Sequence, residues 1–569
     1  MVRGFACVLL LGASILEIGH AATYEVGPGA TFRDLNELLA AETLGPDDTV
    51  LLRGNTTYGS ARIRSQHGGE PGHPTRIIGV NVNGLPPRFE GGVNTVHNQA
   101  SYIEFENLDI TGGSFRCFFH QGTGVVLRRV FVHDCPGNGI LGADQDSGSL
   151  TIEYSAVVNA GANGGRHAIY MSTDQVRYPD SVFRLQFSYV SDSQFGTGEG
   201  GNLIKSRAER NEIYYNWLES GFYHELELIG PDPAGVADGW TESLAREDSD
   251  IVGNVILHTS DFGSILRLGG DATGQSFGRY RFVNNTVIRT GGGQATVFRL
   301  FDGLESLEAS NNVFFNAGSS ALRIVRETEA NWFTGSTTIA GKNNWMESGS
   351  VSIPDGFTDS IIAADPKFSN FSRLDLRPAA DSPLINSGVA TNTSEPEFAI
   401  QAPKSQPVFH PPAKPSGLPN ANAEFRLAEG PIDLGAFEAT AGPEGLVGAT
   451  GSWFDPASSG RGFNIQFIAR DRFLIYFYGF SDSGERLWLV GDYQGEVAPG
   501  TAVTVNMLEA TGGVFNNFDP DAVTLDSWGT LELTFFDCES ASGSLLGSEG
   551  TEQLALTRLA GVEGLGCGG

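Results

Sequence analysis

One position of successive short apolar segments carries side chains that can act as acids, bases and anion ligands. In each segment apolar and polar residues alternate, which is typical of a strand with one buried face. If the apolar residues Ile204 and Leu266 point into a core, the residue after each of them points outward. Reading the other segments in the same way gives an outward column of Tyr170, Lys205, Glu227, Arg267 and Arg299. Lysine and glutamate are uncommon in strands, so the column favours a function over an ordinary solvated face.

The column contains what eliminative cleavage of a uronate sugar chain requires. That reaction needs a cation to neutralise the carboxylate, a base to remove the C5 proton and an acid to protonate the leaving oxygen. Arginines bind carboxylates through two parallel hydrogen bonds, which predicts this role for Arg267, Arg299 and Arg207. A Ca²⁺ ion held by Glu225 and Glu227 is the alternative neutralising group, because calcium prefers oxygen ligands. Both alternatives fit the residue types.

The proton transfers are assigned to residues within or beside the column. Lys205 is the expected base, because neighbouring guanidinium groups favour its neutral form. Tyr170 or His167 is the expected proton donor. His224 flanks the column and, with the two glutamates, is expected to bind substrate.

The same segments are compatible with two alternative functions. A glycoside hydrolase needs two carboxyl groups, and Glu225 and Glu227 lie two residues apart on one strand, with backbones about 6.6 Å apart. One strand would put both acids on the same side of the sugar, however, whereas acid and base usually flank the bond. A non-catalytic surface protein is the third alternative. The insertion at residues 231–250 beside the column favours a binding cleft instead.

A short repeat predicts the fold that would position this column. A polar residue, one further residue and a β-branched or aromatic residue recur at intervals of 22 to 38 residues. The polar members are Asn107, Arg129, Ser155, Ser188, Asn216, Asn254, Asn285, Asn312 and Asn344. Turns of variable length between strands in constant register are typical of a solenoid, in which stacked asparagines bond along a ladder. The expected fold is an all-β, right-handed parallel β-helix.

Several motifs resemble the pectate-lyase-like, PbH1-repeat family of secreted β-helix proteins. "YEVGPGATFRDLNELL" resembles the opening strand and capping helix of that family, "DPKF" and "DSPLINSG" its last coils, and "DLGAFE" its closing strand. The segment "NLIKSRAERNEIYYNW" is similar to alginate-lyase and chondroitinase-B-type β-helices, whose catalytic lysine matches Lys205. Where those proteins have a basic residue on the next coil, this chain has "HELEL". Two alternatives follow from this departure: the basic role passes to Arg267 one coil further, or the reaction differs from that of the family.

A second module begins near Leu446, after "EATAGPEG", and is expected to be a small antiparallel β domain over residues 446–569. Apolar runs such as "FLIYFYGF" and "RLWLVG" are separated by the turn sequence "SDSGE", which indicates hairpins. The segments "GSWFDPASSGRGFNIQF" and "ERLWLVGDY" resemble an accessory domain of secreted bacterial proteins. Its many aromatic residues either fill a small core or stack on sugar rings.

The beginning of the chain and its charge indicate export and an extracellular polymer as partner. Residues 1–21 have a basic start and a short apolar run, as a signal peptide does, which leaves 22–445 for the β-helix. The formal net charge of −31 argues against nucleic acid or an anionic membrane, and no segment is long and apolar enough to span a bilayer. An acidic polysaccharide would then be bound by a local basic patch. We expect a monomer, because a capped β-helix exposes no sheet edge.

Four cysteines follow the expected signal peptide. Cys538 and Cys567 are predicted to form a disulfide, since exported proteins are oxidised. Cys117 and Cys135 are either bonded or buried thiols. Their spacing does not indicate zinc.

Overall fold

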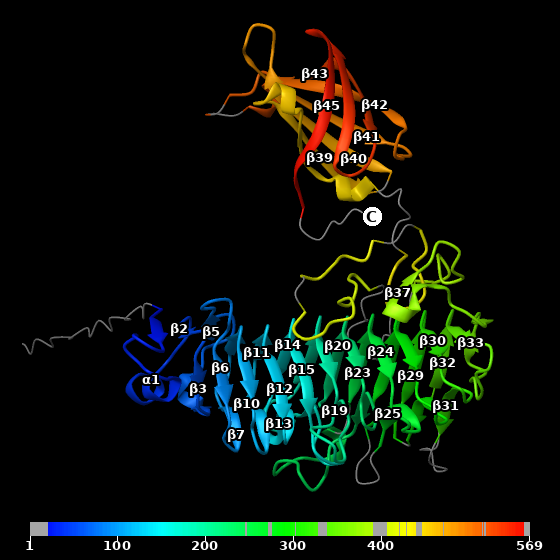
Figure 1. Ribbon diagram of the computed structural model, residues 1–569. Helices are drawn as coiled ribbons and strands as arrows, with labels where there is room; N and C mark the ends of the chain where they lie inside the picture. The colour runs from blue at the N-terminus through cyan, green and yellow to red at the C-terminus, as the bar shows by residue number, and fades with distance from the viewer. Residues whose placement is uncertain are drawn as a thin grey trace, which may run out of the picture.

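The computed structural model describes residues 21–244, 247–270, 276–301, 303–327, 338–390, 407–419, 422–427, 430–439, 446–469, 471–514, 516 and 519–562. These ranges form a long parallel β-helix, blue to green in Figure 1, and a closed antiparallel barrel, yellow to red. The predicted fold class is thereby confirmed. Residues 1–20, which make up most of the expected signal peptide, and Cys567 lie outside the described ranges.

In the described ranges, ten coils of the β-helix contribute one strand to each of three parallel sheets, which we name A, B and C, and the coils at its two ends add three strands to sheet A and two to sheet B. Sheet A consists of β1 (Thr23–Val26), β2 (Thr49–Arg53), β5 (Thr75–Val80), β8 (Ile103–Glu106), β11 (Val125–Arg128), β14 (Leu150–Glu153), β17 (Val182–Gln186), β20 (Arg210–Tyr214), β23 (Asp248–Val252), β26 (Arg279–Val283), β29 (Ser306–Ser310), β32 (Thr338–Lys342) and β34 (Phe357–Thr358). Sheet B consists of β3 (Thr57–Tyr58), β6 (Arg88–Glu90), β9 (Asp109–Thr111), β12 (Phe131–Cys135), β15 (Ala156–Ala160), β18 (Tyr189–Ser191), β21 (Trp217–Glu219), β24 (Val255–His258), β27 (Thr286–Arg289), β30 (Val313–Asn316), β33 (Trp345–Glu347) and β35 (Ile361–Ala363). Sheet C consists of β4 (Ala61–Ile63), β7 (Asn94–Asn98), β10 (Arg116–Gly122), β13 (Asn138–Ser147), β16 (Ile169–Ser172), β19 (Ile204–Arg207), β22 (Leu226–Ile229), β25 (Ser264–Gly269), β28 (Thr296–Leu300) and β31 (Arg323–Glu327).

The turn between sheets A and B is built the same way in coil after coil. One residue with a left-handed φ ends the sheet A strand, for example Tyr215 (56°) or Gly253 (67°), and the next residue is a buried asparagine. Asn216 donates its amide to Asn254 Oδ1 at 3.0 Å, and Asn254 donates to Asn285 Oδ1 at 2.9 Å. The bonds continue through Asn312 and Asn344. The predicted asparagine ladder is therefore present, and it satisfies buried polar groups that the tight turn would otherwise leave unpaired.

Two predicted members of this ladder were assigned one residue too early. Asn107 and Arg129 have φ values of 56° and 54°, so they occupy the left-handed position of the turn. The buried ladder positions of those coils belong to Leu108 and Val130. Val130 still joins the ladder through its backbone, because its N–H donates to Ser155 Oγ at 3.0 Å.

The first coil is closed by α1 (Leu35–Ala41), as the sequence predicts. Asp34 caps this helix by accepting a hydrogen bond from the Glu37 N–H, which pairs a donor that the helix itself leaves free. Leu35 and Leu38 face inward and join the continuous apolar core of the solenoid. The helix therefore covers the end of the core that no further coil protects.

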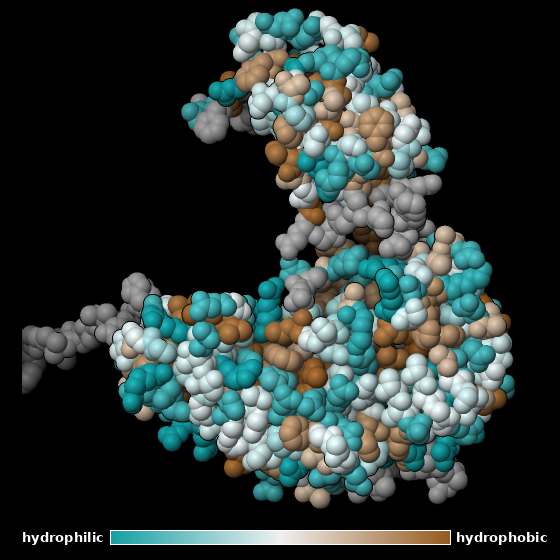
Figure 2. Space-filling model, in the orientation of Figure 1, coloured by the Kyte–Doolittle hydropathy of each residue, from teal (hydrophilic) through white to brown (hydrophobic). Residues whose placement is uncertain are grey.

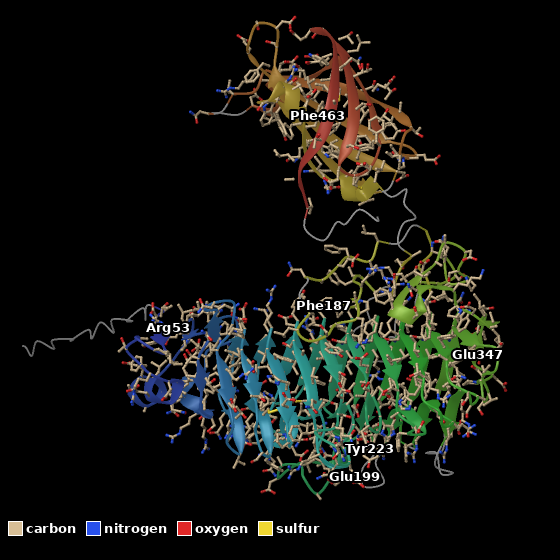
Figure 3. The ribbon with its side chains drawn as sticks, in the orientation of Figure 1. Arg53, Phe187, Glu199, Tyr223, Glu347 and Phe463 are labelled. Carbon is tan, nitrogen blue, oxygen red and sulfur yellow. A yellow bond between two sulfur atoms is a disulfide. The ribbon has the colours of Figure 1, made fainter. Side chains whose placement is uncertain are left out.

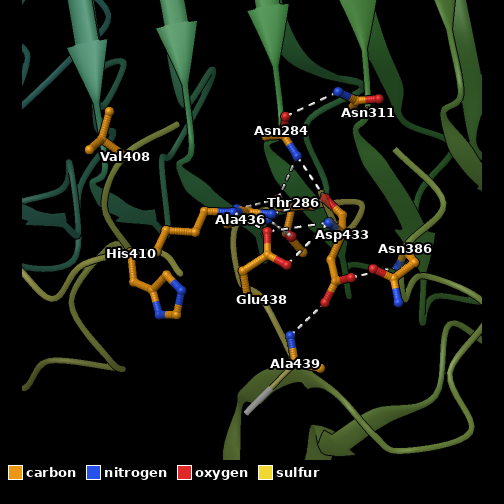
Figure 4. Close-up of polar contacts among 12 residues, drawn as sticks. Asn284, Thr286, Asn311, Asn386, Val408, His410, Asp433, Ala436, Glu438 and Ala439 are labelled. Atoms are coloured by element: carbon orange, nitrogen blue, oxygen red, sulfur yellow. Dashed lines mark hydrogen bonds and ion pairs between the residues drawn. The ribbon is translucent and has the colours of Figure 1, made fainter. Parts of the chain in front are cut away.

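The segments after β35 do not form further coils, in contrast to the expectation for "DPKF", "DSPLINSG" and "DLGAFE". β36 (Phe368–Asn370) pairs antiparallel with β37 (Asp375–Pro378), and residues 433–438 form no strand. They lie along the solenoid instead, because Asn284 Nδ2 donates to the Asp433 carbonyl and Thr286 Oγ1 accepts from the Ala436 N–H (Figure 4). Leu376, Ala436 and Phe437 then cover apolar side chains on the outer face of sheet B, including Trp217.

The barrel is an eight-stranded closed antiparallel sheet. Its strands are β38 (Gly451–Phe454), β39 (Gly462–Ala469), β40 (Arg472–Phe480), β41 (Arg486–Gln494), β42 (Ala502–Thr511), β43 (Thr524–Phe535), β44 (Ser540–Gly547) and β45 (Gly550–Gly561). Trp453, Phe463 and Phe473 are among the aromatic residues that fill the interior; Phe463 is labelled in Figure 3. Short 3-10 helices elsewhere are η1 (Ser65–His67), η2 (Glu242–Leu244), η3 (Phe371–Arg373), η4 (Leu446–Ala449), η5 (Pro456–Ser458) and η6 (Pro520–Ala522). In the described ranges we find no helix with the length and apolarity that a membrane crossing requires.

The three cysteines in the described ranges, Cys117, Cys135 and Cys538, are all disulfide-bonded. Cys117 on β10 and Cys135 on β12 form a disulfide within one coil, which selects the bonded alternative left open by the sequence. Cys538 is also disulfide-bonded. Its predicted partner Cys567 is outside the described ranges.

Candidate functional site

The structure places the five predicted column residues opposite one another on sheet C. Tyr170 pairs with Lys205, Lys205 with Glu227, Glu227 with Arg267, and Arg267 with Arg299. The residues that precede them, from Ile169 to Phe298, are fully buried and form the inner column. Adjacent strands are about 4.8 Å apart, so each coil adds one functional group to an outward strip.

The strip extends one strand beyond the predicted set. Arg326 on β31 pairs with Arg299 and is exposed. The sequence contained this signal, because Arg326 follows Val325 in the same alternating pattern that located the other members. The strip is defined from here on as Tyr170, Lys205, Glu227, Arg267, Arg299 and Arg326.

Glu227 is the centre of this strip and its single carboxylate. Lys205 Nζ is 3.3 Å from Glu227 Oε2, and Arg267 Nη1 donates to Glu227 Oε1 at 2.5 Å. Burial of the side chain raises the pKa of Glu227, but the charges of Lys205 and Arg267 outweigh burial and lower it to about 2. Glu227 therefore stays ionised and holds the two cations in place. Lys205 is thus set beside a carboxylate, and not among guanidinium groups as the sequence predicted.

Arg267 and Arg299 share an aromatic neighbour, Phe301, which alternation along the strands does not identify. Their guanidinium carbons lie 4.2 and 4.9 Å from the ring centre of Phe301. Burial lowers the pKa of Arg299, and the neighbouring charges of Arg267 and Arg326 lower it further. Three like charges crowd this end of the strip, and an anion bound there would relieve their repulsion.

Arg207 lies behind the strip and supports Tyr170. Its Nε donates to the Tyr170 hydroxyl at 3.2 Å, and its Nη1 donates to the Gly230 carbonyl at 2.6 Å. Arg207 is only 4% exposed, so its position does not suit the substrate contact that the sequence predicted. Burial raises the pKa of Tyr170 to about 12, which keeps its hydroxyl protonated at neutral pH.

His167 and His224 form a second layer with Asn202, at the point where each sheet C strand begins. The Asn202 N–H donates to His167 Nδ1 at 2.9 Å, and Asn202 Oδ1 lies 3.1 Å from His224 Nδ1. Asn202 Nδ2 also donates to Glu227 Oε2, which ties this layer to the strip. Burial lowers the pKa of each histidine to about 3, so both rings are neutral.

These contacts fix the role of each histidine. Because His167 Nδ1 accepts a hydrogen bond from a backbone amide, its proton is on Nε2, and a neutral imidazole is a poor acid. His167 is also 1% exposed. Of the two residues predicted as proton donors, His167 is therefore the less suitable. His224 donates from Nδ1 to Asn202 and is 5% exposed, so it positions Asn202 and Glu227.

Glu225 faces away from the strip, and this corrects two predictions. Its carboxylate lies 2.7 Å from His258 Nδ1, and the side chain is completely buried. Glu225 and Glu227 thus contact different groups, because Glu225 ends the preceding turn and does not lie on β22. They do not form the acid pair of a hydrolase. They also do not fit a calcium site, since Glu227 is already neutralised by two cations, and no group of three metal-binding side chains occurs among the described residues.

Loops border the strip. The insertion after β22 folds back toward the preceding coils, where Trp240 Nε1 donates to Gln175 Oε1 at 2.8 Å and Gln145 Nε2 donates to the Gly235 carbonyl. Glu199 and Tyr223, both labelled in Figure 3, belong to the turns that precede β19 and β22. The ring of Tyr223 packs edge-on against Phe262 at 5.1 Å. These borders agree with the predicted wall beside the column.

Comparisons with known proteins give no family for this chain. No protein-family model matches the sequence, and no curated protein matches it. One similar solved structure is a PL6 family polysaccharide lyase from Pseudopedobacter saltans, with 12% identity and a TM-score of 0.34 over 60% of this chain and 92% of that chain. Another is the full-length tailspike protein 2 of Escherichia coli O157:H7 bacteriophage CAB120, with 10% identity and a TM-score of 0.19 over 90% and 65%. Scores this low carry no conclusion, so the fold assignment rests on the sheets described above.

Proposed function

We propose that the strip on sheet C binds a chain of acidic sugars and cleaves it by β-elimination. One observation carries this proposal. Lys205, Arg267, Arg299 and Arg326 stand in register around the single carboxylate of Glu227, in a chain whose formal net charge is −31. A local surplus of cations on a strongly acidic protein suits an anionic ligand.

The dimensions of the strip suit a polymer. From Lys205 to Arg326 the strip crosses four strand spacings, or about 19 Å. Arg267, Arg299 and Arg326 are in line, so successive carboxylates of one sugar chain would each meet a guanidinium group. Phe301 lies against two of these groups, with its ring centre 4.2 Å from the guanidinium carbon of Arg267 and 4.9 Å from that of Arg299.

Lys205 and Tyr170 would perform the proton transfers. In its neutral form, the Lys205 amine accepts the C5 proton, the C5–H electron pair becomes the C4–C5 double bond, and the C4–O bond breaks. The leaving oxygen then takes the hydroxyl proton of Tyr170. Arg207 occupies the Tyr170 oxygen as a donor, which leaves the hydroxyl hydrogen to point at another group. Lys205 Nζ is 5.4 Å from the Tyr170 ring centre, so acid and base act side by side.

The proposal includes export of the chain. The start of the sequence resembles a signal peptide, and a polysaccharide of many units is met outside the cytoplasm. The disulfide between Cys117 and Cys135 is the kind of bond that persists in an oxidising compartment. Sequencing the amino terminus of the protein recovered from outside the cells would test this part.

The test of the reaction uses a panel of uronate-containing polysaccharides. We expect the purified chain to produce the ultraviolet absorbance of an unsaturated uronate end with at least one of them. Lys205→Met should lower that rate by about 100-fold or more, because it removes the base. Lys342→Met is the matched control, since Lys342 is an exposed lysine of sheet A, whereas the strip lies on sheet C.

Each other outcome contradicts part of the proposal. New reducing ends without absorbance would show hydrolysis. Binding without either signal would leave a carbohydrate-binding protein, and equal rates in the two lysine variants would exclude Lys205 as the base.

A further inference from the structure

The outer surface of the barrel carries a cluster of exposed aromatic rings on β40 and β41. Trp488 is 67% exposed, Phe480 57% and Tyr478 36%, and Tyr476 beside them is half-buried. We name these four residues the aromatic platform. Apolar and polar residues are mixed on the barrel surface visible in Figure 2. Large aromatic rings this exposed are uncommon on a soluble module unless they bind something.

The rings of the platform are held in a defined arrangement. Tyr478 and Trp488 are cross-strand partners, with ring centres 5.1 Å apart and planes at 71°. On its other side Tyr478 faces Gly462 of β39, which has no side chain to cover the tyrosine ring. The two ring planes are therefore steeply inclined to each other, and the β39 residue opposite Tyr478 has no side chain to cover it.

The platform is not part of the barrel core. Side chains alternate along each strand, and Phe477, Leu487 and Leu489 supply the inward positions between the platform residues. The outward positions need only be polar for the barrel to fold, yet they carry tryptophan, tyrosine and phenylalanine. Some of the aromatic residues of residues 446–569 therefore fill the barrel core, and others lie on its surface.

Charge selects the kind of ligand that the platform fits. Residues 446–569 contain five arginines, no lysine and sixteen acidic residues, a formal net charge of −11. A second copy of the chain, an anionic membrane or an acidic sugar polymer would all be repelled by this charge. Neutral sugars are not repelled, and the apolar faces of their rings stack on aromatic side chains.

We propose that the aromatic platform is a second carbohydrate-binding site, which takes an uncharged polysaccharide by stacking of pyranose rings on Trp488 and Tyr478. This site differs from the strip on sheet C in both place and ligand charge. It would hold the chain on a neutral matrix polymer in which an acidic polymer is embedded. Its existence does not depend on the reaction proposed above, because binding to the platform is measured without any cleavage.

The experiment titrates the full chain with uncharged hexasaccharides of glucose, mannose and xylose, and with an uronate hexasaccharide for comparison. Tryptophan fluorescence and calorimetry report binding. We expect at least one neutral hexasaccharide to bind saturably, and Trp488→Ala to weaken that binding by about tenfold or more. Leu559→Ala is the matched control, because Leu559 is also 67% exposed on the same barrel but lies on β45.

Binding in Leu559→Ala equal to the unmodified chain, with loss in Trp488→Ala, supports the platform. The proposal is overturned if no neutral hexasaccharide binds, or if Trp488→Ala binds as well as the control. It is also overturned if Trp488→Ala instead abolishes a concentration-dependent dimer seen by sedimentation, or adsorption to phosphatidylcholine vesicles. Trp488→Ala should leave the cleavage of a short uronate substrate unchanged, which separates this result from failure of the strip.

Discussion

Two faces of the same solenoid carry columns of charged residues, and the columns differ in balance. On sheet A, Arg184, Glu212, Asp250, Arg281 and Glu308 are paired in register, and Arg210 lies beside them. Three arginines there meet three carboxylates. On sheet C, four cations surround one carboxylate.

The difference separates charge that stabilises the fold from charge that is kept for a ligand. Arg281 Nε donates to Asp250 Oδ1 at 2.7 Å, and both side chains are almost completely buried. Burial raises the pKa of Asp250, and the charges of Arg281 and Arg210 offset part of that cost. Arg299 is partly exposed, and burial together with the charges of Arg267 and Arg326 lowers its pKa, so an anion bound beside it would reduce this repulsion. Both sheets are stacks of parallel strands, so the difference between the two columns comes from their side chains.

The largest expected effect is on stability, from Arg281→Met. This change leaves the buried Asp250 with only Arg210, and removing one partner of a buried pair typically costs about 3–5 kcal/mol. Arg299→Met should change the free energy of unfolding by less than about 1 kcal/mol, because it removes a repelled charge. Urea unfolding followed by circular dichroism measures both. Equal losses in the two variants would show that the sheet C column is structural as well.

The second expected effect is on activity, where Arg299→Met should cause the larger loss and Arg281→Met the smaller one. Arg299→Met should lower kcat/KM on an acidic polysaccharide by about 10- to 100-fold, because a guanidinium group that would bind one carboxylate of the sugar chain is lost. Arg281→Met should retain kcat/KM per folded molecule. Steady-state rates on the same substrate, corrected for the folded fraction, make this comparison. A smaller loss in Arg299→Met than in Arg281→Met would reverse the assignment of the two faces.

The third effect concerns pH and Glu227. Because the pKa of Glu227 is lower in the folded chain, about 2, than in the unfolded chain, its ionisation stabilises the fold above about pH 4. That contribution is lost as the pH falls from about 4 toward 2. The difference in stability between the unmodified chain and Glu227→Gln should therefore be largest near neutral pH and shrink on acidification. Urea midpoints measured over this range test it, and a difference independent of pH would show that Glu227 is not held by Lys205 and Arg267.

The smallest effect separates the strip from the aromatic platform. Raising the ionic strength should weaken the binding of an acidic oligosaccharide by the strip, because salt screens charges across about 10 Å at 0.1 M. Binding of a neutral hexasaccharide by Trp488 should hardly change. Calorimetric titrations at two salt concentrations provide the measurement. Parallel salt dependence for the two ligands would mean that they share a site.

The sequence was sufficient for the fold and for the register of the strip, because both depend on local periodicity. Alternation along each strand placed Lys205 and Arg267 outward, and the asparagine repeat indicated the stacked coils. It failed where the backbone departs from a regular strand. Glu225 seemed to share a face with Glu227, but it belongs to the turn and contacts His258. Asn107 and Arg129 were placed in the ladder, although each takes the left-handed position one residue earlier.

The partners of each group were also beyond the reach of the sequence. His167 and Arg207 are close to the strip along the chain, yet both are buried behind it. Asn202, which connects the two histidines with Glu227, carried no distinctive signal. Contacts of this kind depend on side-chain depth, which alternation does not report.

The asparagine ladder has a consequence for how such a protein can change. Each asparagine bonds to the equivalent residue of the next coil, so a coil carries its own means of joining to its neighbours. Solenoid stability is approximately a sum of such neighbour contacts. Duplication of one coil in the gene would then lengthen the molecule without disturbing the rest, and would add one position to the row of cations. The length of the polymer segment that is gripped can therefore evolve in whole steps, independently of the chemistry at Lys205.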